Sequence, residues 1–120
     1  MIVDKTDGAL NRQRGDDWEF DCLKYLINAG HKDIGTSRLW NERADKLGID
    51  IVSQYDEVVF PFNISCKATS SLVNYPQLLD NLPRNEGIIN TVLHRKYYRG
   101  EIKAEVAILY IDDFLQLIKK

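Results

Sequence analysis

The chain has 120 residues, of which 44% are hydrophobic and 28% are charged. This composition is typical of a folded globule rather than a disordered or fibrous protein. Chains of about 100–150 residues usually build one core, so we expect a single domain over residues 1–120 and exclude a two-domain enzyme. The net charge of −2 excludes nucleic-acid binding by bulk positive charge alone, although a local basic surface is still allowed.

The cysteine content and the hydropathy pattern predict a cellular location. Only Cys22 and Cys66 are present, too few for a disulfide-stapled secreted scaffold and without the spacing of a zinc site. No run of about 18 apolar residues occurs, and the first residues are too charged for a signal peptide. We therefore expect a cytoplasmic protein that does not cross a membrane.

The first predicted element is a helix over residues 16–29. Its apolar side chains recur at helical spacing: Trp18, Cys22, Leu26 and Ala29. Asp16 or Asp17 can cap the N-terminus of this helix, and Gly30 supplies a stop.

The middle of the chain predicts a β-hairpin. Residues 31–47 show no sustained period and predict a loop, with a short strand around Ser37–Trp40. Residues 48–53 and 58–67 are rich in β-branched and aromatic side chains and predict two strands, joined by a turn at Tyr55–Glu57. Pro61 lies inside the second run, which is tolerated at a bulge or on an edge strand.

The last third of the chain predicts two helices around two further strands. Residues 74–82 predict a short helix, residues 88–95 and 105–111 predict strands separated by a charged turn, and Asp112-Asp113 cap a final helix. The order is α-β-β-α-β-β-α. We therefore predict an α/β (α+β) fold with a mixed central sheet flanked by helices.

Three charged side chains are predicted to meet on this sheet. Side chains alternate between the faces of a strand, so Ser65 and Lys67 point away from the apolar Ile64 and Cys66. By the same rule, Asp50 points opposite to its isoleucine neighbours, and the hairpin would place it beside Lys67. The first helix adds Glu19 near the apolar stripe that packs on the sheet.

Two carboxylates and a lysine can support hydrolysis of a phosphodiester bond. Mg²⁺ prefers one or two carboxylates with waters and phosphate oxygens, and a bound cation lowers the pKa of its water. Lys67 would then position the nucleophile or stabilise developing negative charge. The same residues are equally compatible with a solvated surface ion pair, and spacing alone does not decide between these alternatives.

The residues around this group resemble a known family. The segments Gly15-Asp-Asp-Trp-Glu19, Gly48-Ile-Asp50-Ile and Ile64-Ser-Cys-Lys67 resemble the PD-(D/E)XK nuclease superfamily, especially its archaeal and phage Holliday junction resolvase-like members. The resemblance implies a restriction-endonuclease-like fold and a Mg²⁺-dependent DNA endonuclease of recombination and repair, commonly a homodimer, in which Mn²⁺ can substitute. It assigns Glu19 and Asp50 to the metal and Lys67 to catalysis.

One position departs from the family pattern. An acidic residue or Gln usually stands two residues before the lysine, but this chain has Ser65, which cannot add negative charge. Either the Ser65 hydroxyl or its bound water fills the coordination shell of the catalytic metal, with the Cys66 carbonyl as a further ligand, or the site has lost activity. Asp45 could supply a substitute carboxylate, although a loop aspartate is more often a turn-former. The first reading predicts weak metal affinity.

Candidate DNA-binding residues fall in two segments. Ser37 and Arg38 resemble a pair that lies near the phosphate backbone in resolvase-like nucleases, and a solvated loop arginine is the alternative. The second segment is basic and aromatic, and its candidate contacts are Arg95, Lys96 and Arg99. Residues 61–120 carry 8 Lys/Arg against 6 Asp/Glu, a local excess of positive charge.

The leading hypothesis is therefore a metal-dependent endonuclease that acts on DNA, particularly branched or junction DNA, as a homodimer. Two alternatives remain. Because Ser65 occupies the acidic position, the chain could be a non-catalytic DNA-binding or assembly module that keeps the nuclease fold. It could also be an accessory subunit whose partner completes the site.

Overall fold

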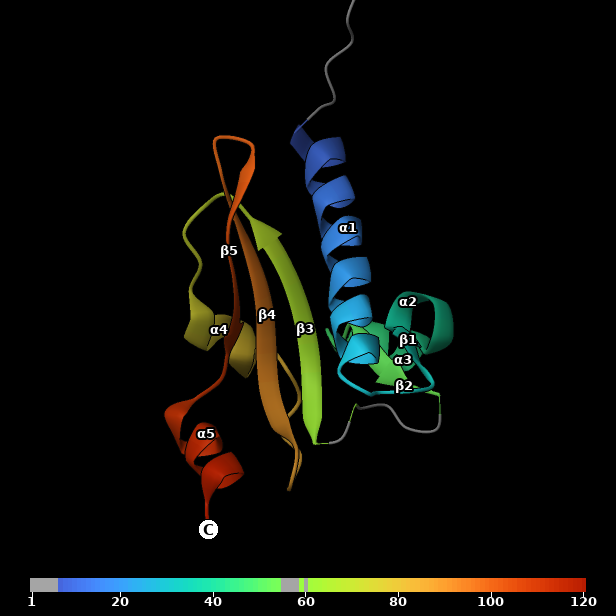
Figure 1. The fold of residues 1–120 in the computed structure, drawn as a ribbon, viewed down its shortest axis with the longest axis vertical. Helices are drawn as coiled ribbons and strands as arrows, with labels where there is room; N and C mark the ends of the chain where they lie inside the picture. The colour runs from blue at the N-terminus through green and yellow to red at the C-terminus, as the bar shows by residue number, and fades with distance from the viewer. Residues whose placement is uncertain (1–6, 55–58, 60) are drawn as a thin grey trace, which may run out of the picture.

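The computed structural model describes residues 7–54, 59 and 61–120 and is built on a five-stranded mixed sheet (Figure 1). The strands follow one another in space as they do in the chain: β1 (Ile34–Thr36), β2 (Ile51–Ser53), β3 (Phe62–Thr69), β4 (Ile89–Tyr98) and β5 (Glu101–Ile108). The helices are α1 (Asp7–Asn28), α2 (Ser37–Trp40), α3 (Glu42–Lys46), α4 (Tyr75–Asp80) and α5 (Ile111–Ile118). The predicted mixed sheet with flanking helices is confirmed, whereas the predicted order lacked β1, α2 and α3.

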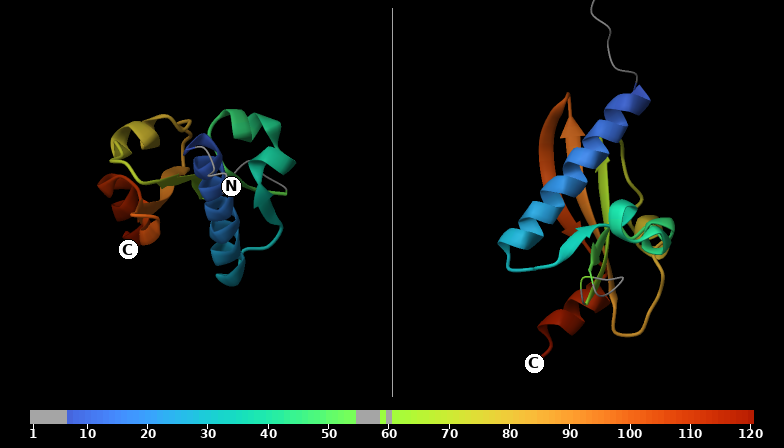
Figure 2. Two further views of the ribbon diagram at one scale, coloured as in Figure 1. Left: turned by 90° about the horizontal axis from the view of Figure 1, so that it is seen from above. Right: turned by 90° about the vertical axis from the view of Figure 1, so that its right-hand side faces the viewer.

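The two faces of the sheet are covered by different helices. Helix α1 crosses one face over β3, and α4 packs against β4 from the other side (Figure 2). Strands β3 and β4 are parallel, so the chain must cross over between them, and α4 lies in that crossover. The remaining neighbours in the sheet are antiparallel.

Helix α1 is longer than predicted. It begins at Asp7, so Gly15 lies inside the helix and neither Asp16 nor Asp17 caps it. Residues 11–13 of the early turns are exposed and polar, which removes the apolar period that would have indicated a helix. The predicted stop is confirmed, because the helix ends at Asn28 and Gly30 has a φ of +107°.

The segment predicted as a strand around Ser37–Trp40 is instead the short helix α2, and the strand β1 comes just before it. Gly35 in β1 explains this arrangement, because the indole of Trp40 lies directly over it. A Cβ at position 35 would stand 2.6 Å from Trp40 Cε2. Helix α3 follows at once, capped by Asn41, whose side chain accepts a hydrogen bond from Ala44 N at 3.0 Å.

Strands β2 and β3 pair antiparallel, which confirms the pairing predicted for the hairpin. Their register joins Ile51 to Ile64. Pro61 precedes β3 and therefore leaves its ladder intact. The predicted turn at Tyr55–Glu57 lies outside the described residues.

The β4–β5 hairpin extends further than predicted at its turn. Arg99 and Gly100 both have positive φ, 51° and 81°, as a two-residue type I′ turn requires. Helix α4 begins after Asn74, whose side chain accepts from Gln77 N at 3.1 Å. In α5, Asp112 and Asp113 occupy the first turn rather than the cap, which is Tyr110.

The core consists of two clusters on either side of β2. The larger cluster joins α1 to β1–β3 and contains Trp18, Cys22, Ile34, Ile51, Val59 and Ile64. The smaller contains Ala44, Ile49, Val52 and Leu82. Burial of these side chains fixes α1 on one side of β3 and α3 beside β2, and the candidate site lies where these elements meet.

Candidate active site

The site forms where β2 and β3 separate. Asp50 precedes β2 and is held by its backbone: its N–H donates to Ile64 O at 2.7 Å, and its carbonyl accepts from Ser37 N at 2.8 Å. The Asp50 carboxylate is turned toward β3, where Oδ2 accepts from Cys66 N at 2.6 Å and from Ser65 Oγ at 3.5 Å. The Asp50 carboxylate therefore accepts the hydrogen bond from Cys66 N that a backbone carbonyl of a neighbouring strand would otherwise accept.

This geometry corrects the predicted alternation around Asp50. Ile49 and Ile51 do not share a face, because Ile49 belongs to the smaller cluster and Ile51 to the larger one. The cause is local: β2 begins only at Ile51, and Gly48 before it has a φ of +84°. Asp50 consequently projects between the two strands rather than from one face of the sheet.

Burial has the largest effect on the pKa of Asp50. Removal from water raises the pKa of Asp50, because the charged carboxylate is the better solvated form. The Cys66 N–H hydrogen bond and the positive charge of Lys67 act in the opposite direction, while the negative charge of Asp45 adds to the rise. Asp50 and Lys67, 17 positions apart in the chain, are thus close enough to interact.

Glu19 on α1 approaches the same point from the other side. Burial, followed by the negative charge of Asp50, raises the pKa of Glu19 from 4.5 to about 7. Asp16 and Asp45 contribute in the same direction, and only Arg38 opposes them. The side chain is half-buried. The fold therefore keeps several carboxylates together in a partly desolvated place, at a cost in free energy.

Ser65 and Lys67 share one face of β3, as the alternation predicted, and this face is the one toward α4. They line a small cavity of about 50 Å³ together with Gly48, Leu78, Asn81 and Leu82. Ser65 is buried and Lys67 is exposed. The ammonium of Lys67 is thus accessible to a charged ligand, while the Ser65 hydroxyl contacts Asp50 within the protein.

The donor set fits a hard divalent cation. Asp50 and Glu19 offer carboxylate oxygens, and the pKa of each is raised by burial and by negative neighbours that a cation would neutralise. Among the described residues, no group of three or more Asp, Glu, His or Cys side chains is placed to hold a metal ion. Two carboxylates with waters match the ligands that Mg²⁺ prefers. Cys66 lies at the same split between the strands, where its carbonyl would be the further ligand.

Ser37, Arg38 and Asp45 surround the acidic side of the site. Ser37 is buried, and its hydroxyl donates to Asp45 Oδ1 at 3.4 Å. Arg38 is exposed and forms an ion pair with Asp16 at 2.7 Å. The proposed DNA contact at Ser37 therefore falls on a hydroxyl inside the protein, whereas the guanidinium of Arg38 is at the surface.

Arg95 is not available as a surface phosphate ligand. It is 4% exposed, and its guanidinium donates to Asp21 Oδ2 at 2.6 Å and to Glu105 Oε2 at 2.7 Å. It also lies 4.5 Å from the centre of the Trp18 ring. Burial alone would lower the pKa of Arg95, but these hydrogen-bonded carboxylates raise it. Arg95 therefore ties α1 to β4 and β5, and the interpretation of Arg95 as a DNA ligand is wrong for this folded state.

The other two candidates in this segment lie nearer the surface. Lys96 is half-buried on β4, in register with Thr69 of β3. Arg99 is exposed in the β4–β5 turn, and its guanidinium stands 5.2 Å from the centre of the Tyr98 ring. Both remain candidates for contact with a phosphate backbone.

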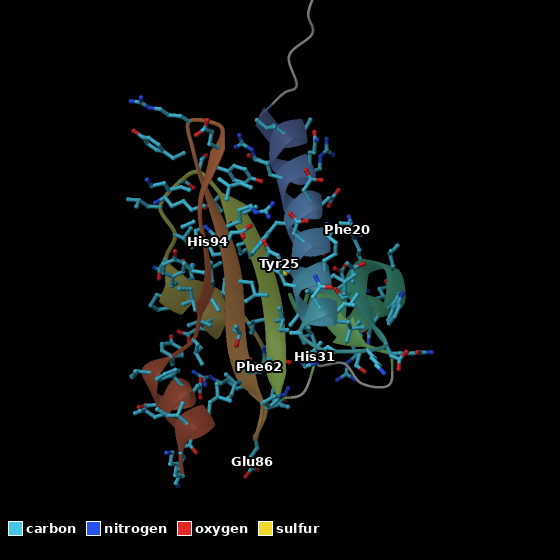
Figure 3. The ribbon with its side chains drawn as sticks, viewed as in Figure 1. Phe20, Tyr25, His31, Phe62, Glu86 and His94 are labelled. Carbon is cyan, nitrogen blue, oxygen red and sulfur yellow. The ribbon has the colours of Figure 1, made fainter. Side chains whose placement is uncertain are left out.

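A polar cluster around His94 was not predicted as part of the site. His94, labelled in Figure 3, is buried on β4 in register with Lys67 of β3. Its ring nitrogens are hydrogen-bonded to Thr69 Oγ1 and Tyr75 Oη, both at 2.8 Å. Burial, followed by the charge of Lys96, lowers the pKa of His94. The predicted strands included no pairing between β3 and β4, so the contact between His94 and Thr69 was not predicted.

Of the two free cysteines, Cys22 is buried and Cys66 is half-buried. Cys22 of α1 and Cys66 of β3 share a hydrogen bond, which together with burial raises the pKa of Cys66 well above its ordinary value. Raised thiol pKa values disfavour the reactive thiolate. Both side chains therefore serve the packing of α1 on β3, next to Asp50.

Comparison with protein-family models, with curated proteins and with solved structures found no match for this chain. None of the helices in the described ranges is long and apolar enough to span a bilayer. A function must therefore be inferred from the geometry of the site and from the resemblance of its sequence segments to a nuclease superfamily.

Proposed function

We propose that this protein is a divalent-metal-dependent DNA endonuclease that acts on branched or junction DNA. The observation that carries the proposal is the position of Asp50, which the Cys66 N–H holds between β2 and β3. The charge of Asp50 acts on Glu19, and the charge of Lys67 acts on Asp50. These residues come from a helix, a strand entrance and the neighbouring strand. Two carboxylates beside an exposed lysine are the groups that hydrolysis of a phosphodiester needs.

Each residue has a distinct role in this proposal. Glu19 and Asp50, with the Cys66 carbonyl, hold Mg²⁺ or Mn²⁺, and the bound cation supplies an acidified water for attack on phosphorus. The Cys66 N–H fixes Asp50 Oδ2, which leaves Oδ1 to face a ligand. Lys67 stabilises the negative charge that grows on the phosphate oxygens. Ser65 supports catalysis indirectly, through its contact with Asp50.

Three cations of the described residues would position the DNA. Arg38 on α2, Lys96 on β4 and Arg99 in the β4–β5 turn are the candidates that remain for phosphate contacts. One chain carries one such site, so cleavage of paired strands needs two copies. A homodimer on junction DNA is the assembly that this requirement favours.

The test is cleavage of a labelled four-way junction with Mg²⁺ or Mn²⁺, compared between the native protein and Asp50→Asn. Asparagine keeps an acceptor for the Cys66 N–H but removes the charge, so the variant should fold and bind the junction without cutting it. Glu42→Gln is the matched control, since it removes one negative charge from an exposed position in α3. We expect this control to cut at the native rate.

Two results would contradict the proposal. The first is no cleavage by the native protein with any divalent cation. The second is equal cleavage by the native protein and by Asp50→Asn, which would place the activity elsewhere or in a contaminant.

A second candidate, a non-catalytic DNA-binding or assembly module, is favoured by one observation. Ser65 stands where the family has an acidic residue, and it is 4% exposed beside Asp50. Ser65→Glu distinguishes the two functions when metal affinity is measured by calorimetry. Tighter metal binding supports the endonuclease, whereas junction binding without metal affinity in either form supports the module.

A further inference from the structure

Helix α5 carries an apolar surface that the described residues do not cover. Ile111, Phe114, Leu115 and Ile118 recur at helical spacing and form one stripe, with Leu117 beside it. Ile111 is 67% exposed, and the other four are 44–54% exposed. At side-chain areas of roughly 200 Å² each, about 500 Å² of apolar surface lies on one short helix, near the upper end for a monomer.

The charges at the two ends of α5 complement each other. Asp112 and Asp113 stand in its first turn, and Lys119 and Lys120 follow its last. A second α5 lying antiparallel would bring the acidic end of each helix beside the basic end of the other. A parallel arrangement would bring like charges together. The helix is thus complementary to itself in one orientation, which is the requirement for an interface between identical copies.

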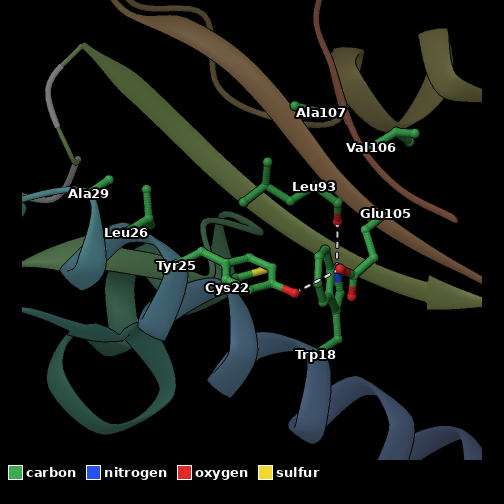
Figure 4. Close-up of a pocket in the computed structure, with 9 residues that line it drawn as sticks. All are labelled: Trp18, Cys22, Tyr25, Leu26, Ala29, Leu93, Glu105, Val106 and Ala107. Atoms are coloured by element: carbon green, nitrogen blue, oxygen red, sulfur yellow. Dashed lines mark hydrogen bonds between the residues drawn. The ribbon is translucent and has the colours of Figure 1, made fainter. Parts of the chain in front are cut away.

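A groove beside α5 extends this surface along the sheet. Two hollows of about 440 and 230 Å³ share Leu26, Leu93 and Ala107, and Leu117 of α5 lines the smaller one. Figure 4 shows the larger hollow, with Trp18 and Tyr25 of α1 facing Leu93 and Glu105. Together, the α5 stripe and the groove offer an area that approaches the roughly 800 Å² buried by each partner in a standard interface.

The edge strand β5 is poorly suited to pairing with a strand of another molecule. The ladder between β4 and β5 shifts its register at Lys96/Tyr97, which leaves Lys103 opposite no partner. A bulge with a lysine on an edge strand discourages the addition of another strand. The acidic first turn of α5 also argues against a membrane surface, because interfacial helices carry Lys and Arg on their polar face.

We propose that a second copy of this chain docks on α5, with the two α5 helices antiparallel about a two-fold axis and their apolar stripes in contact. This interface lies apart from Glu19, Asp50 and Lys67, and it does not depend on the proposed nuclease activity. The interface is tested by measuring the oligomeric state, whereas the endonuclease proposal is tested by cleavage. Failure of one proposal can therefore be distinguished from failure of the other.

The test is sedimentation velocity of the full chain across a wide range of protein concentration. We expect the native chain to sediment as a dimer and Leu115→Glu to weaken dimerisation at least tenfold, since a charge then faces the partner's apolar stripe. Leu72→Glu is the matched control, because Leu72 is 93% exposed between β3 and α4 and lies on no shared surface. Circular dichroism checks that both variants fold.

Charge exchange tests whether the charged ends of the two α5 helices face each other across the interface. One variant combines Asp112→Lys with Asp113→Lys, and the other combines Lys119→Asp with Lys120→Asp. Each alone should be a monomer because like charges then meet, whereas an equal mixture should form a mixed dimer. A monomeric native chain, a native-like Leu115→Glu dimer or failure of the mixture to pair would each overturn the proposal. So would a monomer that binds lipid vesicles.

Discussion

Replacing the half-buried Glu19 measures how much its ionised carboxylate destabilises the folded protein. We expect Glu19→Gln to raise the free energy of unfolding of the metal-free protein at pH 8. Burial and the charge of Asp50 disfavour the ionised form of Glu19 in the folded state, while water solvates it in the unfolded chain. Glutamine has the shape of the protonated acid and carries no charge to disfavour.

The expected gain is about 1–2 kcal/mol. A rise in the pKa of Glu19 from 4.5 to about 7 corresponds to about 3.4 kcal/mol, at about 1.4 kcal/mol per pKa unit. Because the side chain is only partly buried and still contacts water, solvent screening reduces the effective penalty, and we discount the figure by about half.

The sign follows from proton binding. Between pH 4.5 and about 7, folded Glu19 keeps a proton that the unfolded chain releases, so the stability of the native protein falls as pH rises through this window. The advantage of Glu19→Gln therefore grows across it and is constant above. The lowered pKa of His94 produces the opposite slope as pH falls below 6.5, which is why the variant must be compared with the native protein at each pH.

The assay is urea unfolding from pH 4 to pH 9 with a chelator present. Glu42→Gln is the control: its side chain is exposed in α3, and we expect a change within about 0.5 kcal/mol. A difference between Glu19→Gln and the native protein that is independent of pH would refute the reasoning. So would a variant that is less stable than the native protein at pH 8.

Three further predictions use the same unfolding measurement. Mg²⁺ at ten times its dissociation constant should raise the native free energy of unfolding by about 1.4 kcal/mol at pH 8, and an equal effect on Asp50→Asn would contradict the assigned site. Arg95→Ala should lower the free energy of unfolding by about 3 kcal/mol, because two carboxylates lose a buried partner; a loss under about 0.5 kcal/mol would show that Arg95 is not a structural tie. Gly35→Ala should lower the free energy of unfolding by about 1–2 kcal/mol through its clash with Trp40, whereas Gly15→Ala, with open space around its Cβ position, should raise it by about 0.5–1 kcal/mol. Equal effects of the two glycine substitutions would argue against the packing of Trp40 on β1.

Elements with a strong local pattern could be predicted from the sequence. The β-branched run of β3 and the Asn74 cap of α4 are signals carried by neighbouring residues, and both elements are present. Helix α2 has four residues and no such signal. Its position depends on the contact between Gly35 and the Trp40 ring, which exists only after β1 and α2 have come together.

The candidate site was likewise predictable only where neighbouring residues in the chain determine it. The pairing of the hairpin was enough to bring Asp50 near Lys67, because both lie close to the register of Ile51 and Ile64. The direction of the Asp50 side chain depends on the backbone at Gly48, which alternation alone could not predict. Arg95 looked like a surface cation because its partner Asp21 lies 74 positions away in the chain.

The two carboxylates are held in different ways, and this difference bears on the metal binding that we propose. Asp50 is fixed between two strands by the Cys66 N–H, a hydrogen bond that offsets part of the penalty of burial. Glu19 has charged neighbours that mostly oppose its ionisation, and its pKa of about 7 means that it is only partly ionised at neutral pH. A divalent cation that binds to both would therefore gain most at Glu19, where it removes a penalty that the fold itself imposes. The affinity for metal should accordingly rise with pH through 7, and Glu19→Gln should abolish this dependence while Asp50 stays anchored.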